Sequence, residues 1–400
     1  MKVLSINAGS SSLKFQMYEM PEEKVLISGR FERIGLDKAF YTIKLNGEKI
    51  QKEAELKDHG VCVQILIQEL LDNKVISSLD EIEAVGHRLV HGGDKFSKSV
   101  IITDEVIKTV EELSDLAPLH NPANLMGVRA FMEKIPGAVQ VGCFDTAFHQ
   151  TMKEDRYLYA VPYEWYEKYG VRKYGFHGMS HRYVSERLAD LVDKDYSNVI
   201  VCHIGNGGSI SLVRDGKCVD TSMGFTPNAG IIMGSRCGDI DYSIIPYIAK
   251  KEGLTIDEID NILNKQSGIL GASGISSDFR DIDEEIAKKN PRAIMSHYLF
   301  VNSIVNYIAK YYVELNGRID AIGFTAGVGE NAPHVRRMVI DRLSCLGFKI
   351  DREKNDAIRF GKEGLISTPE STVPIYVIPT DEEVMIARDT YNLKMNGQED

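Results

Sequence analysis

Short apolar segments flank a polar turn at the start of the chain. Residues 3–6 are mainly apolar, residues 7–12 run Asn-Ala-Gly-Ser-Ser-Ser, and residues 13–18 alternate between apolar and polar side chains. Two β-prone segments on either side of a tight glycine-containing turn predict a β-hairpin.

The same pattern returns half a chain later. Residues 199–216 again contain an apolar segment, a glycine-rich turn and an alternating segment. In this alignment Gly9 and Ser11 correspond to Gly207 and Ser209. The repetition predicts a duplicated domain.

Segments with helical spacing of apolar residues lie between the strand-like segments. A third apolar run, at residues 321–326, leads through a glycine-rich loop into one of them. Strands that alternate with helices predict an α/β fold. Thr380 stands three residues before Glu383, which predicts a capping box at the start of the last helix. The segments with helical spacing are residues 104–116, 180–192, 291–315, 332–346 and 382–394.

The length of the chain predicts two domains, because 400 residues exceed what a single hydrophobic core usually holds. We expect the first domain to cover residues 1–150 and the second to cover residues 151–381. The terminal helix, about residues 382–396, is expected to return to the first domain.

Composition and charge exclude several classes of protein. The net charge of −11 argues against nucleic acid as a partner, since such proteins present basic surfaces. We find neither a membrane-spanning apolar stretch nor a signal peptide. The six cysteines are scattered, as is typical of reduced thiols in a cytoplasmic protein. If the substrates are anions, individual arginines must oppose the overall negative charge.

The two repeated turns have the chemistry of phosphate-binding loops. Glycine lets the backbone approach a ligand closely, serines donate hydrogen bonds, and Lys14 adds a positive charge. The turn at residues 7–12 is not a Walker A loop, and taken alone such a turn is more often an ordinary hairpin. Two such turns in two halves of the chain suggest a grip on one polyphosphate. A third loop, residues 327–331, is typical of contacts to a base or ribose, whereas residues 278–280 look like a solvated turn.

Histidine spacing does not indicate a zinc site. His177 and His181 are four residues apart, as are His87 and His91, but the glutamate of HExxH and a third ligand are missing. Without further context, an arginine such as Arg88 or Arg236 is a surface residue or a member of an ion pair.

Several motifs along the chain together resemble the acetate kinase family. They cover about residues 1 to 390 in the family's order, which implies a kinase of the acetate and sugar kinase, heat-shock ATPase and actin superfamily. That resemblance implies two ribonuclease-H-like domains, also called actin-like ATPase domains, with the nucleotide in the cleft between them. The motifs are residues 4–14, 86–93, 143–149, 174–178, 201–210, 233–238 and 378–383.

The resemblance also implies roles for individual residues. Asn7 and Glu382 match the site for magnesium, or for manganese in its place. Arg88 matches the substrate-binding arginine, and Asp145 matches the catalytic carboxylate. His177 and Arg236 match the residues that stabilise the transition state, and Val90, Leu119, Phe176 and Pro227 match the apolar pocket for the acetate methyl group. The ATP-contacting positions are Lys14, His203, Ile204, Gly205, Asn206, Gly207, Asp278, Phe279, Arg280, Gly327, Val328, Gly329, Glu330 and Asn331. The family further implies a homodimer.

The chemistry implied is phosphoryl transfer from ATP to acetate, which gives acetyl phosphate and ADP. A carboxylate is already ionised at neutral pH, so it needs no general base, and the barrier is the repulsion between two anions. Arginine suits this task because its planar group binds two oxygens and keeps its charge. The part played by Asp145 stays open between proton transfer and the positioning of magnesium.

Three other functions remain as alternatives. A propionate or butyrate kinase would use the same chemistry with a larger pocket. A sugar kinase would need a base for a hydroxyl group and polar sugar-binding residues. An actin-like assembly protein would keep the nucleotide loops but would not need Arg88, Asp145, His177 and Arg236 together.

Overall fold

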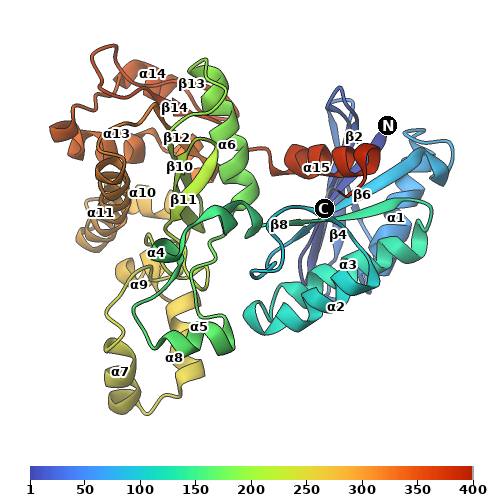
Figure 1. Ribbon diagram of the computed structural model, residues 1–400, viewed down its shortest axis with the longest axis horizontal. Helices are drawn as coiled ribbons and strands as arrows, with labels where there is room; N and C mark the ends of the chain where they lie inside the picture. The colour runs from blue at the N-terminus through green and yellow to red at the C-terminus, as the bar shows by residue number, and fades with distance from the viewer. Residues whose placement is uncertain (399–400) are drawn as a thin grey trace. The chain divides into compact units, whose positions relative to one another are not determined.

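The computed structural model describes residues 1–398 and divides into two compact units. The first unit comprises Met1–Phe148 and the chain from Asp381 onward, and the second comprises His149–Thr380. Each unit contains one mixed β-sheet covered by helices (Figure 1). The predicted α/β class is therefore confirmed.

The sheet of the first unit has eight strands in the order β5-β4-β3-β2-β1-β6-β8-β7. Strands β1 and β2 form the predicted hairpin, and β1, β6 and β8 run parallel. The carboxyl ends of these three strands therefore meet at the same edge of the sheet. The strands are β1 (Lys2–Ala8), β2 (Ser12–Glu19), β3 (Lys24–Glu32), β4 (Phe40–Leu45), β5 (Glu48–Glu53), β6 (Ile82–Leu89), β7 (Val100–Ile101) and β8 (Val139–Phe144).

Helices cover the sheet of the first unit, and one of them comes from the far end of the chain. Figure 1 shows this helix, α15, beside β6 although the sequence separates them widely. Gly86 allows the close approach, because a Cβ atom there would lie 2.5 Å from Ile386 of α15. Gly127 of α3 likewise lies against Ala8 of β1. The helices are α1 (His59–Asp72), α2 (Asp104–Glu112), α3 (Asn121–Lys134) and α15 (Glu382–Asn396).

The sheet of the second unit has six strands in the order β11-β10-β9-β12-β14-β13. Its first five strands repeat the directions of β3-β2-β1-β6-β8, with an antiparallel meander followed by two parallel strands. This shared topology supports the duplication inferred from the repeated turns. The strands are β9 (Val199–Ile204), β10 (Gly208–Arg214), β11 (Lys217–Thr221), β12 (Ala321–Thr325), β13 (Gly364–Leu365) and β14 (Ile375–Val377).

Helices α6 and α11 pack against this second sheet. Gly323 of β12 lies against Val184 and Leu188 of α6, while Phe300 and Ile304 of α11 enter the hydrophobic core. The helices are α4 (Glu154–Tyr157), α5 (Tyr163–Tyr169), α6 (Gly178–Leu191), α7 (Ile244–Glu252), α8 (Ile256–Lys265), α9 (Gly268–Ser273), α10 (Phe279–Ala287), α11 (Pro291–Glu314), α12 (Ala326–Asn331), α13 (Pro333–Arg342) and α14 (Arg352–Ala357).

Two local expectations differ from the structure. Residues 327–331, expected as a loop, belong to the short helix α12. Residues 278–280, expected as a solvated turn, begin helix α10, because the Asp278 carboxylate accepts a hydrogen bond from the Arg280 amide and Phe279 is buried. Among residues 1–398, no helix combines the length and the apolar character needed to cross a bilayer.

Replacing Gly86 with alanine is expected to destabilise the first unit. The added methyl group would lie 2.1 Å from Thr390 Oγ1, so α15 or β6 would have to shift. Overpacking of this kind costs roughly 1–3 kcal/mol, which chemical denaturation would measure. Gly137→Ala is the control, because a Cβ atom there meets nothing within 4 Å. Equal stability of the two variants would contradict the close packing of α15.

Candidate active site

Four predicted site residues gather at the carboxyl edge of the first sheet. Asn7 is near the end of β1, Arg88 is near the end of β6, Asp145 follows β8, and Glu382 begins α15. The parallel course of the three strands brings the first three together. The electrostatic effect of Glu382 on Arg88 places its carboxylate in the same group.

An ion pair between Arg88 and Asp145 forms the centre of this group. Arg88 Nε donates to Asp145 Oδ1 at 3.0 Å, and Nη2 donates to the other carboxylate oxygen. On the opposite side of the guanidinium, Nη1 donates to Asn7 Oδ1 at 3.3 Å. Burial alone would lower the pKa of Arg88, but Asp145 and Glu382 together raise it above its ordinary value. Arg88 therefore keeps its positive charge.

Negative charge exceeds positive charge around Arg88. Burial raises the pKa of Glu382 to about 7, Arg88 opposes the rise, and the charges of Asp145 and Glu383 add to it. Three carboxylates thus share two nearby cations, Arg88 and Lys14. The group has both the oxygen ligands and the charge to accept a divalent cation.

The predicted capping box at the start of α15 is wrong. The N-cap is Asp381, whose carboxylate accepts a hydrogen bond from the Val384 amide at 2.9 Å. Glu383 instead forms an ion pair with Lys14 on β2. The spacing of Thr380 and Glu383 suggested Thr380 as the N-cap, but the helix begins one residue later, and the Asp381 carboxylate caps it.

A chain of hydrogen bonds fixes the side chain of His177 in the second unit. Its Nδ1 lies 2.9 Å from Ser209 Oγ, which in turn lies 2.6 Å from His181 Nε2. His181 Nδ1 lies 2.7 Å from Ser211 Oγ. Burial lowers the pKa of His181 well below its ordinary value, so this imidazole stays neutral. Ser209 is fully buried and positions the two histidines.

The side chains of His177 and Arg236 converge on Gly207. A Cβ atom at Gly207 would lie 3.4 Å from Arg236 Nη1 and 3.9 Å from His177 Nε2. The two loops involved are joined, because the Gly234 amide donates to the Asn206 carbonyl at 2.9 Å. Glycine at position 207 therefore leaves a space that two nitrogen-bearing side chains border.

Arg236 has no carboxylate partner among residues 1–398. Its Nη1 lies 3.4 Å from the Pro227 carbonyl and 3.9 Å from the Met233 sulfur, which are weak interactions for a guanidinium. Burial lowers the pKa of Arg236 below its ordinary value. A partly buried cation with such partners is suited to an anionic ligand.

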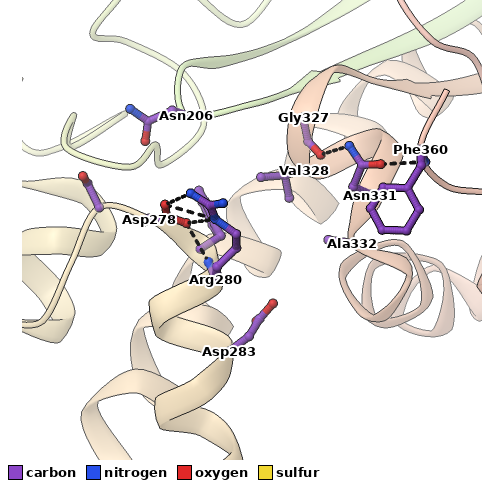
Figure 2. Close-up of a pocket in the computed structure, with 11 residues that line it drawn as sticks. Asn206, Asp278, Arg280, Asp283, Gly327, Val328, Asn331, Ala332 and Phe360 are labelled. Atoms are coloured by element: carbon purple, nitrogen blue, oxygen red, sulfur yellow. Dashed lines mark hydrogen bonds and ion pairs between the residues drawn. The ribbon is translucent and has the colours of Figure 1, made fainter. Parts of the chain in front are cut away.

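A pocket of about 530 Å³ lies wholly within the second unit. Figure 2 shows Asn206 on one side of it, Asp278 and Arg280 at the start of α10, and Val328 and Asn331 on α12. Its volume is in the range of small-molecule sites. The lining residues are Asn206, Ser277, Asp278, Phe279, Arg280, Asp283, Gly327, Val328, Asn331, Ala332 and Phe360.

Polar contacts hold the walls of this pocket. Arg280 Nε donates to Asp278 Oδ1 at 3.0 Å and Nη2 donates to Oδ2 at 2.6 Å, and these bonds hold the pKa of Asp278 down to about 2. Asn331 Nδ2 donates to the Gly327 carbonyl at 3.0 Å, and its Oδ1 accepts from the Phe360 amide at 2.8 Å. The Phe360 ring is 80% exposed and stands at the pocket (Figure 2).

The pocket brings together only part of the expected ATP-contacting set. Seven of those residues line it, while Lys14 belongs to the first unit. Glu330 turns its carboxylate to the backbone, where it accepts from the amides of Ala326 and Thr380. The expected residues outside the lining are Lys14, His203, Ile204, Gly205, Gly207, Gly329 and Glu330.

Four lining residues were not predicted from the sequence. They are Ser277, Asp283, Ala332 and Phe360. Phe360 is distant in sequence from the other lining residues, and no motif surrounds it. Its exposed side chain is the one feature that marks it as a candidate binding residue, and that exposure is known only from the structure.

The residues expected to form the apolar pocket are divided between the units. Val90 and Leu119 belong to the first unit, and Phe176 and Pro227 belong to the second. Val90 and Phe176 are buried, whereas Leu119 is 69% exposed.

Comparisons with known proteins agree with this architecture. An acetate kinase of Geobacillus sp. (strain WCH70) is 54% identical over 398 residues, covering 99% of this chain and 100% of that protein. The crystal structure of Porphyromonas gingivalis acetate kinase has a TM-score of 0.93 and 47% identity, and covers 98% of this chain and 99% of that one. A propionate kinase from Francisella tularensis has a TM-score of 0.92, 42% identity and the same coverage of the two chains.

The duplicated sheets and the polar groups at their edges define a kinase with the two-domain actin-like ATPase fold. The family model described as the acetokinase family matches residues 2–388. The chain belongs to the acetokinase family, and it is therefore a phosphotransferase.

Removing the exposed ring at the pocket is expected to weaken nucleotide binding. A base stacked on an aromatic side chain contributes roughly 1–3 kcal/mol, so Phe360→Ala should weaken ADP binding about 5- to 150-fold. Isothermal titration calorimetry measures the change. Tyr169→Ala, which removes another exposed ring of the second unit, is the control and should bind like the wild type. Wild-type affinity for ADP in Phe360→Ala would show that this ring does not contact the nucleotide.

Proposed function

We propose that this kinase transfers the γ-phosphoryl group of ATP reversibly and directly to acetate, with magnesium as the metal. The products are acetyl phosphate and ADP. The observation that carries this proposal is the ion pair between the partly buried Arg88 and the buried Asp145 at the ends of β6 and β8, beside the oxygen ligands of Asn7 and Glu382. It supplies a fixed positive charge where an anionic nucleophile must be held.

Arg88 binds the acetate carboxylate in this proposal. Asp145 occupies the Nε–Nη2 side of the guanidinium, and Asn7 accepts one hydrogen bond from Nη1. An arginine carries five N–H groups, so donors on Nη1 and Nη2 remain for a second carboxylate. Charge-assisted bonds of this kind position the acetate oxygen for attack without any change in its protonation.

Asn7 and Glu382 hold the magnesium ion in this proposal. An amide oxygen and a carboxylate are the hard oxygen ligands that Mg²⁺ takes, with waters and phosphate oxygens filling the other positions. The excess of carboxylates around Arg88 supports a cation there. When bound, magnesium neutralises phosphate charge.

His177 and Arg236 stabilise the transferring phosphoryl group. Their nitrogens border the space over Gly207. From there both side chains can stabilise the negative charge on the equatorial oxygens of the phosphoryl group. Ser209 and His181 hold the ring of His177 in place, so it needs no reorganisation during the reaction. The pocket of the second unit binds the nucleoside part of ATP.

We assign Asp145 a positioning role through Arg88. Its two oxygens both accept from the guanidinium, and it is 2% exposed. A carboxylate engaged in this way is poorly placed to move a proton, and acetate has none to give up at neutral pH.

We include a homodimer and a cytoplasmic location in the proposal. Family resemblance suggests the homodimer. All six cysteines are free thiols, and Cys345 is exposed, which suits a reducing compartment.

Propionate is a second candidate substrate. The propionate kinase from Francisella tularensis is 42% identical over almost the whole chain, so the fold accommodates that activity in a relative. The two substrates differ by one methylene group.

A carboxylate panel tests the proposed substrate. We expect acetate to give the highest kcat/KM, with propionate about 10- to 200-fold lower and butyrate lower again, because each methylene contributes roughly 1–3 kcal/mol. Hydroxylamine trapping of the acyl phosphate, with ATP and magnesium, measures all three. A maximum at propionate or butyrate would replace the acetate assignment.

Gly207→Ala should slow phosphoryl transfer without destabilising the folded protein. The new methyl group would sit at ordinary contact distance from Arg236 and His177, in the space assigned to the phosphoryl oxygens. Misplacement of about 1 Å costs roughly 100-fold, so kcat should fall by that order while thermal stability stays unchanged. Gly137→Ala serves as the matched control. An unchanged kcat would move the phosphoryl group away from Gly207.

A double-mutant cycle tests the role of Asp145. Arg88→Ala should raise the KM for acetate, and Asp145→Asn should raise it less, because the amide keeps one acceptor for Nε. If Asp145 acts through Arg88, adding Asp145→Asn to Arg88→Ala should cause little further loss. Fully additive losses, or a separate rise in the magnesium requirement, would assign Asp145 to the metal or to the chemistry.

A further inference from the structure

Three side chains outside the proposed reaction centre form a compact cluster in the second unit. Asp283 is on α10, His297 is on α11 and His334 is on α13. One ligand atom from each lies within 4.8 Å of the others. His334 Nε2 and Asp283 Oδ1 are 3.0 Å apart.

His297 is the unusual member of this cluster. Its side chain is 3% exposed, and neither ring nitrogen has a hydrogen-bond partner among residues 1–398. Its ring stacks on that of His334, with centroids 5.4 Å apart. Buried polar atoms are nearly always satisfied, so two unsatisfied nitrogens on one buried ring call for an additional ligand. A simple ion pair between Asp283 and His334 does not explain them.

We propose that Asp283, His297 and His334 bind a transition metal ion of the Zn²⁺ type. Two imidazole nitrogens and one carboxylate oxygen match the three protein ligands of open four-coordinate zinc sites. Bonds of about 2.0–2.1 Å in a tetrahedron place ligand atoms roughly 3.3 Å apart, so side-chain rotations must draw in the ligand atoms, which lie within 4.8 Å of one another without the ion. Magnesium would not compete well, because it prefers oxygen ligands.

The surrounding helices make this site rigid. Ile282 of α10, Val301 of α11 and Val335 of α13 belong to one hydrophobic core, so the ligands come from elements that already pack together. Asp283 also lines the pocket shown in Figure 2. The bound ion therefore lies beside the pocket proposed for the nucleoside and is distinct from the site of Asn7 and Glu382.

The test is metal binding by the full chain after removal of bound metals by a chelator. Millimolar Mg²⁺ is present throughout to occupy the oxygen-ligand site. Co²⁺ is titrated while the visible absorption of four-coordinate cobalt is followed, and Zn²⁺ is counted by equilibrium dialysis. We expect each chain to bind one Co²⁺ ion or one Zn²⁺ ion. Added Zn²⁺ should displace Co²⁺, so that the visible absorption bands disappear.

Matched variants locate the site. His334→Ala and Asp283→Asn should each weaken Zn²⁺ binding by roughly tenfold or more, since even outer-shell losses cost 10- to 100-fold. Glu284→Gln removes the same charge from a neighbouring exposed position of α10, and Cys345→Ser removes an exposed thiol, and both should bind like the wild type. Absence of the visible bands in the wild type, or equal losses in Glu284→Gln or Cys345→Ser, would overturn the proposal. Circular dichroism confirms that each variant is folded.

Discussion

The ion pair between Arg88 and Asp145 organises the polar edge of the first sheet. Parallel strands β6 and β8 bring the two side chains together, and the carboxylate fixes the plane of the guanidinium through two hydrogen bonds. Asn7 contacts the same guanidinium from β1. Burying one of these charges alone would be costly, so each residue depends on its partner. This mutual dependence keeps a permanent cation at the place where an anionic substrate is proposed to bind.

Charge is distributed unevenly in this protein, and the unevenness suits a reaction between anions. The chain carries a net charge of −11, yet Arg236 is partly buried and, among residues 1–398, has only weak neutral partners. In the first unit the opposite holds, because carboxylates outnumber cations around Arg88. One region is therefore suited to phosphoryl oxygens and the other to a metal ion. Local packing, rather than overall charge, creates both.

Glycines determine how closely the backbone and side chains approach in both units. Gly86 lets α15 lie against β6, and Gly323 does the same for α6 against β12. Gly207 has a different function, since its missing side chain leaves a space bordered by Arg236 and His177. The sequence motif around Gly207 marks the position, but the structure gives the reason for glycine there.

The sequence by itself determined the α/β class, the duplication of a hairpin motif, and the family to which the chain belongs. These three properties follow from the local periodicity of apolar residues and from the order of motifs, and both can be read directly from the sequence. Tertiary structure decided which side chains meet. Glu383 pairs with Lys14 rather than capping α15, Ser209 positions His177 and His181, and Phe360 joins a pocket built from distant segments. Such contacts depend on how elements far apart in sequence pack together, and the local sequence pattern does not specify that packing.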